Sequence, residues 1–146
     1  MQWQWAKLEA LGATDVHAMY QLRQNVFILE QTCLYPDIDE LDEKAWHLLG
    51  WQGSKLTAYA RLLAPGIKYS EPAMGRVLIA MQARGQQLGR ELVSEALTYS
   101  QTTFSTSAMR ISAQLHLAAF YESFGFVTEG DAYDEDGIPH IEMSRR

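Results

Sequence analysis

The chain has 146 residues, 47% of them hydrophobic and 21% charged, which is typical of one soluble folded domain. The formal net charge of -6 argues against a general nucleic-acid-binding surface, and the single cysteine excludes an intrachain disulfide and a cysteine-based zinc site. No apolar run approaches the roughly 20 residues of a membrane span, and the N-terminus lacks the features of a signal peptide, so we expect a cytoplasmic protein without a membrane partner.

Apolar periodicity and turn-forming residues divide the chain into strands and helices. In chain order they predict a strand over 2–8, a helix that ends near residue 31, a loop over 32–44, strands over 45–52, 55–64 and about 74–81, a helix opened by 84–89, a strand over 108–114, a short helix over 116–124, and strands over 126–133 and 138–143. Thr14 and Asp15 are the candidate N-caps of the first helix, and Gly53-Ser54 is the turn of a hairpin. This order predicts an α/β fold with a mixed sheet covered by helices on both faces.

One segment has the features of an anion site. A strand over 75–79 is followed by Gln82-Ala83-Arg84-Gly85-Gln86-Gln87-Leu88-Gly89, which opens an amphipathic helix. The free N–H groups and positive dipole end of a helix N-terminus suit a diphosphate, which Gly85 and Gly89 would let approach and Arg84 would help to neutralise. A helix start with a glycine cap is the simpler interpretation, and neither the Walker motif nor the dinucleotide fingerprint matches.

Two motifs together resemble the GNAT superfamily of N-acetyltransferases. The segment Gln82-x-x-Gly85-x-Gln87, with Arg84 and Gly89, resembles the acetyl-CoA motif of that family, although many members carry glycine or alanine where Gln87 stands. A second signature is resembled by Gln114-x-x-Leu117-x-x-Phe120-Tyr121-x-x-x-Gly125-Phe126. Similarity to the ElaA-type branch extends over nearly the whole chain, through Arg23, Val26-Phe27, Glu30-Gln31, Tyr35-Pro36-Asp37-Ile38-Asp39, His47-x-Leu49-Gly50-Trp51, Ala58-Tyr59-Ala60-Arg61 and Asp136-Gly137-Ile138-Pro139-His140.

The resemblance implies a single GNAT domain over 1–146, whose mostly antiparallel sheet is splayed at its centre. It implies direct transfer of an acetyl group from acetyl-CoA to a primary amine of a small molecule or protein in a ternary complex. The pantetheine arm would lie like an added strand between the strands ending near Ile79 and Gln114, and the N–H of Ile79 would polarise the thioester carbonyl. The residues expected to bind the cofactor are Val77, Ile79, Arg84, Gly85, Gln86, Gln87, Leu88, Gly89, Gln114 and Phe120.

Tyr121 stands at the position of the family's catalytic tyrosine, where it would protonate the departing thiolate. Core packing with its aromatic neighbours is the simpler role. The attacking amine must lose a proton to a general base or a water chain, and the sequence does not choose among Glu30, His116 and His140. Glu30 and His140 are expected to line the acceptor site.

The acidic cluster from Asp37 to Glu43 is interpreted as a solvated loop that steers a cationic acceptor, because the EF-hand pattern fails at Leu41 and Asp42. The four histidines lack the spacing of metal ligands. A non-catalytic CoA-binding sensor or interaction module remains the alternative to an enzyme, since the general base is unassigned. Family habit leaves a homodimer open, and no nucleic-acid partner is expected.

Overall fold

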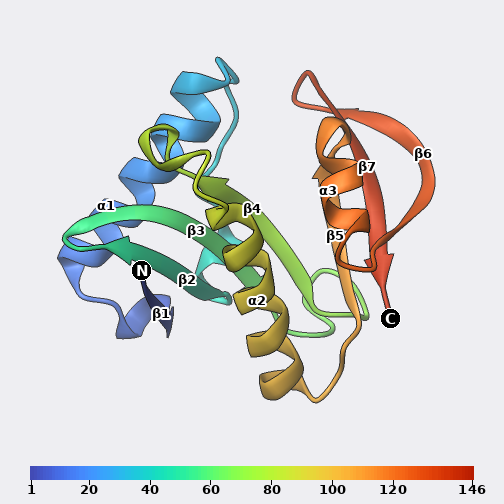
Figure 1. Cartoon of the computed structure of the whole chain (residues 1–146), viewed down its shortest axis with the longest axis horizontal. Coiled ribbons are helices and arrows are strands. Elements are labelled where there is room, and N and C mark those ends of the chain that lie inside the picture. The colour runs from blue at the N-terminus through green and yellow to red at the C-terminus, as the bar shows by residue number, and fades with distance from the viewer.

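Seven strands form one sheet in the order β1-β2-β3-β4-β5-β7-β6 in the computed structural model, which describes residues 1–146 (Figure 1). All neighbouring strands are antiparallel except β4 and β5, which are parallel. The predicted mixed, mostly antiparallel sheet is therefore confirmed. The strands are β1 (Gln2–Lys7), β2 (Trp46–Gln52), β3 (Lys55–Leu63), β4 (Ala73–Ile79), β5 (Met109–Gln114), β6 (Val127–Glu135) and β7 (Ile138–Arg145).

The helices alternate with the strands in the predicted order. The three α-helices are α1 (Ala13–Arg23), α2 (Leu88–Phe104) and α3 (Ala118–Glu122), and α1 continues as the π-helix η2 (Gln24–Glu30). Short 3-10 turns are η1 (Leu8–Ala10), η3 (Glu40–Glu43), η4 (Met81–Ala83) and η5 (Leu115–Leu117). None of these helices combines the length and the apolar composition that a membrane crossing requires.

Several local predictions were wrong. The N-cap of α1 is Gly12 rather than Thr14 or Asp15, and the Asp15 carboxylate instead accepts a hydrogen bond from Gln4 at 3.3 Å. The loop over 32–44 contains η3, because Asp39 and Asp42 form a reciprocal capping box around that turn. The predicted helix over 116–124 is divided into η5 and α3.

The core is divided by the sheet into two layers. Leu48 and Ala60 face α2, whereas their neighbours Leu49 and Tyr59 face α1, as the two-residue period of strands requires. Figure 1 shows α1 and α2 lying on the two sides of β2–β4. Helices on both faces of the sheet are thus confirmed.

The sheet opens between β4 and β5. Their only ladder pair is Ala73 with Arg110, and the two strands diverge beyond it (Figure 1). β4 also carries a bulge, because the residues between Gly75 and Leu78 outnumber those between their β3 partners. Arg76 lies in this bulge with a φ of 52°, a left-handed conformation that is unfavourable for a residue with a side chain. The predicted splay at the centre of the sheet is confirmed.

Candidate active site

An open pocket of about 290 Å³ lies where the end of β4 meets the start of α2. Its lining comes from one continuous turn, from β4 and from α3: Ile79, Ala83, Arg84, Gly85, Gln87, Leu88, Gly89, Arg90 and Phe120. All of the residues that the sequence assigned to the cofactor are among them except Val77, Gln86 and Gln114. One hollow therefore brings together the glycine turn and the second motif.

The turn before α2 leaves main-chain donors uncommitted. Gly85 has a φ of 82° and Gln87 a φ of 62°, so two residues with left-handed backbone precede the helix that begins at Leu88. Gln87 is the N-cap, and no side chain caps the helix there. The first N–H groups of α2 therefore point at the pocket without a partner, together with the positive end of the helix dipole. Such an end binds anions.

The neighbouring edge of β4 is also open. Ala80 donates its N–H to the Thr57 carbonyl of the β3 side at 2.7 Å, so the N–H and C=O of Ile79 point to the opposite edge, toward β5. The two strands have already diverged at this point. An extended ligand laid along this edge would find a main-chain donor and acceptor at Ile79.

Tyr121 is nearly buried, with 5% of its surface exposed, in the core cluster against which Val77 and Ile79 pack. It makes edge-on contacts with Phe120 and Phe126. Burial raises the pKa of the phenol, and neither a hydrogen bond nor a nearby charge contributes to the shift. Its hydroxyl is therefore protonated at neutral pH and has no partner within the protein.

Three of the expected cofactor residues do not line the pocket. Val77 lies in the β4 bulge, while Gln86 accepts a hydrogen bond from Gln52 at 2.9 Å and so turns toward the end of β2. Gln114 ends β5 and donates to Gln31 at 3.4 Å. This last contact bridges the two halves of the splayed sheet.

The candidate bases have different environments. Glu30 accepts two hydrogen bonds from the Arg84 guanidinium, at 2.6 and 2.8 Å. His140 lies on β7 opposite Gln114, and its ring nitrogens face the Ile138 carbonyl at 2.7 Å and the Glu135 carboxylate at 3.2 Å. His116 is exposed in η5 and makes no side-chain hydrogen bond. No candidate has a free, buried basic atom.

The acidic loop is not the solvated steering surface that the sequence suggested. Asp37 and Asp42 are buried, and Asp39 is three-quarters covered. Arg23 binds Asp37 at 2.9 Å and Asp42 at 2.7 Å. Arg61 forms ion pairs with Asp39 at 2.7 Å and with Asp42 at 3.1 Å. The Nε atom of Arg76 lies 2.9 Å from the Asp37 carboxylate, which makes an ion pair, although the geometry there is not that of a hydrogen bond. Three aspartates and three arginines thus neutralise one another.

A buried histidine extends this cluster. His47 is fully buried, with one ring nitrogen 2.6 Å from the Tyr59 hydroxyl and the other 2.9 Å from the Asp42 carbonyl. Burial lowers the pKa of His47, so the ring is neutral at pH 7. Burial alone would raise the pKa of Asp42, but the hydrogen bond and charge of Arg23, with the charge of Arg61, hold it below its usual range. The cluster fixes the loop against the β4 bulge through Arg76.

Sequence reasoning missed two features of this region. Arg90 lines the pocket and lies over the Phe124 ring at 4.7 Å; its position one residue after the glycine motif was a usable signal. Arg23 falls in the apolar stripe of the first helix, and a buried arginine requires acidic partners, which the nearby aspartates supply.

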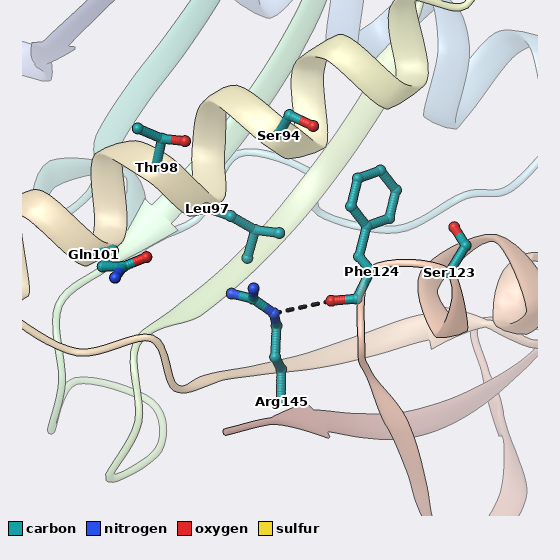
Figure 2. A pocket seen from close by; sticks show the side chains of 7 residues that line it. All are labelled: Ser94, Leu97, Thr98, Gln101, Ser123, Phe124 and Arg145. Atoms are coloured by element: carbon teal, nitrogen blue, oxygen red, sulfur yellow. Dashed lines mark hydrogen bonds between the residues drawn. The ribbon is translucent and has the colours of Figure 1, made fainter.

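A second hollow, of about 380 Å³, lies between α2 and the segment that follows α3. Figure 2 shows Arg145 within it, donating to the Phe124 carbonyl at 2.9 Å. Ser123 and Phe124 of this hollow also contact Arg90 of the first pocket. None of the cofactor, catalytic or acceptor-site residues predicted from the sequence lines this second hollow. The full lining is Ser94, Leu97, Thr98, Gln101, Ser123, Phe124 and Arg145.

An open glycine turn at a helix N-terminus, beside a strand edge freed by a splayed sheet, defines the acyl-CoA-binding class of N-acyltransferases. The family model for the Acetyltransferase (GNAT) domain matches residues 17–146, and this chain belongs to that family. Among its relatives, the protein ElaA of Escherichia coli is 38% identical over 147 residues, with 99% of this chain and 96% of ElaA covered. A UPF0039 protein of Synechocystis is 43% identical, with 98% and 94% covered.

Solved structures agree with the sequence relatives. An acyl-CoA N-acyltransferase from Pseudomonas aeruginosa superposes with a TM-score of 0.94 at 37% identity, over 100% of both chains. The crystal structure of Escherichia coli ElaA gives a TM-score of 0.93 at 37% identity, over 99% of both chains. The GNAT resemblance and its ElaA-type branch are thereby confirmed.

Proposed function

We propose that this chain transfers an acetyl group from acetyl-CoA directly to a primary amine of a small molecule or protein, with both substrates bound at once. The observation that carries the proposal is the continuity between the Arg84–Gly89 turn and the open edge of β4. The turn offers donors to a diphosphate, and the edge offers the peptide group of Ile79 to the arm that follows it. One extended acyl-CoA would use both.

In this mechanism the Ile79 N–H stabilises the negative charge that develops on the thioester oxygen when the amine attacks. The new bond joins the amine nitrogen to the acyl carbon, and the bond from that carbon to sulfur breaks. Tyr121 gives its proton to the departing thiolate, and the proton lost by the amine nitrogen restores the phenol directly or through water. Burial keeps the Tyr121 phenol protonated at neutral pH, which a proton donor requires.

The test combines binding and turnover. Calorimetry should detect uptake of acetyl-CoA, and a panel of primary amines should release free thiol from it. Tyr121→Phe removes only the hydroxyl, so turnover should fall by about 100-fold, within the usual range for general acid catalysis, while acetyl-CoA affinity stays unchanged.

Tyr99→Phe is the matched control, since Tyr99 is a partly buried tyrosine stacked on Trp5 with no hydrogen bond from its hydroxyl, and its turnover should not change. Absence of acetyl-CoA uptake would overturn the proposal. Uptake without thiol release on any amine would support the sensor alternative instead. Unchanged turnover in Tyr121→Phe would remove that residue from the mechanism.

A further inference from the structure

Arg84 makes three side-chain hydrogen bonds to other groups of the chain. Its Nη1 and Nη2 atoms donate to the two carboxylate oxygens of Glu30 at 2.6 and 2.8 Å, and its Nε donates to the Ile79 carbonyl at 3.1 Å. The ion pair joins the end of η2 to the turn before α2, which are separated by 54 residues in the sequence. Both side chains are accessible to solvent, with 42% of Arg84 and 25% of Glu30 exposed.

These are the same groups that the two substrates would use. Arg84 lines the diphosphate pocket, the Ile79 peptide lies on the open edge of β4, and Glu30 is a candidate for the acceptor side. The Arg84 guanidinium, expected to bind the phosphates, and the Glu30 carboxylate, expected to face the acceptor, therefore neutralise each other. A guanidinium paired through both Nη atoms with a carboxylate cannot present the same fork to a phosphate.

We propose that the Arg84–Glu30 ion pair is a latch that couples the two substrate sites. Acyl-CoA binding draws the Arg84 guanidinium from Glu30 to the diphosphate, and this exchange leaves the Glu30 carboxylate free to bind the acceptor amine. Acyl-CoA thus binds first, and the acceptor site becomes anionic only afterwards. This inference rests on the proposed function and names Glu30 as a residue that determines acceptor affinity.

The energies permit the exchange. Water reaches both partners of the Arg84–Glu30 pair and screens their attraction, so little net free energy is lost when the pair separates. A diphosphate held by the α2 N-terminus offers Arg84 a doubly charged partner beside free N–H donors, which is stronger. Because coupling between binding sites is reciprocal, a cation that engages Glu30 should also raise the affinity for acyl-CoA.

The latch predicts opposite effects of one substitution on the two substrates. Glu30→Gln releases Arg84, so the Kd for acetyl-CoA measured by calorimetry should fall by about two- to fivefold, the equivalent of the pair energy. In thiol-release assays with the fastest amine of the panel, the same variant should raise the KM for the amine. A residue with only a structural role would weaken both.

Glu91→Gln is the matched control. Glu91 lies in the first turn of α2, is exposed and makes no ion pair, so this change removes the same charge near the same pocket without touching Arg84. Its Kd for acetyl-CoA should change less than that of Glu30→Gln. A double-mutant cycle completes the test, because Glu30→Gln should have no effect on acetyl-CoA affinity in an Arg84→Ala background.

The outcomes separate the two ideas. If no variant takes up acetyl-CoA, the proposed function fails. If all take it up but Glu30→Gln binds no more tightly than the unaltered chain, the latch is overturned and the function stands. Equal tightening in Glu91→Gln, or tightening that persists without Arg84, would likewise overturn the latch, because general repulsion would then explain it.

Discussion

The acidic loop over 36–44 and the turn over 80–89 are two irregular segments whose appearance in sequence is misleading in opposite ways. The loop carries five acidic residues, yet its three aspartates form ion pairs with three arginines. The turn carries one arginine and little else that is charged, yet its main-chain donors face an open pocket. The difference between the loop and the turn teaches that groups without partners inside the protein are the better candidates for binding a ligand. The number of charged residues in a segment is a poor guide, because charges can neutralise one another.

The strongest test of the comparison removes one buried charge. Asp42→Asn should lower the free energy of unfolding by about 3 kcal/mol, because Arg23 and Arg61 would keep their buried charges without this shared carboxylate. Urea denaturation measures the change. Glu43→Gln is the control, since Glu43 is the exposed next residue of the same turn, and its effect should stay within about 0.5 kcal/mol. Equal stability of the two variants would show that the loop is solvated after all.

The buried cluster also predicts how stability depends on pH. The pKa of His47 is lowered in the folded state, so the unfolded chain binds the proton first, and stability should fall as the pH drops below about 6.5 toward the folded pKa. Asp42 has a depressed folded pKa, so its contribution is present above about 3.9 and is lost as the pH falls through the folded value. Each group adds a slope of up to about 1.4 kcal/mol per pH unit.

Urea midpoints measured from pH 8 to pH 3 check this profile. His47→Gln should abolish the first decline, whereas His116→Gln, at an exposed position, should leave it in place. A flat profile between pH 7 and pH 5 in the unaltered chain would contradict the burial of a neutral histidine.

The smallest expected effect lies in the turn. Gln87→Gly should raise the free energy of unfolding by about 0.5–1 kcal/mol, because glycine adopts the left-handed conformation of this N-cap without strain. Acetyl-CoA affinity should be retained, since the binding groups that we propose are main-chain amides. Gln86→Gly is the control: residue 86 has no positive φ, so glycine there should be neutral or destabilising in the same urea titration. Stabilisation by both changes would contradict a specific effect of the left-handed backbone at residue 87.

Much of the architecture could be predicted from the sequence, because strands and helices there follow strong apolar periods and the two GNAT motifs have fixed spacing. Errors arose where a side chain had a distant partner. Asp15 was expected to cap a helix, but Gln4 of the neighbouring strand holds its carboxylate. Pairing across the fold, such as that of Arg84 with Glu30, leaves no local trace in the chain. Residues of the two motifs, by contrast, lie near one another as expected, because Gly85, Gly89 and Phe120 line one pocket.

The single ladder pair between Ala73 and Arg110 has a consequence for the width of the slot between β4 and β5. Because few main-chain hydrogen bonds join β4 to β5, we expect the distance between these strands to depend on the side chains packed between the two halves of the sheet. Leu92 and Val93 of α2 belong to one cluster with Ala60 from one half and Ile111 from the other. Changing the size of such interior residues would widen or narrow the slot without altering any group that touches a ligand. We therefore expect the width of the slot to depend on interior residues of α2 as well as on the residues that line it.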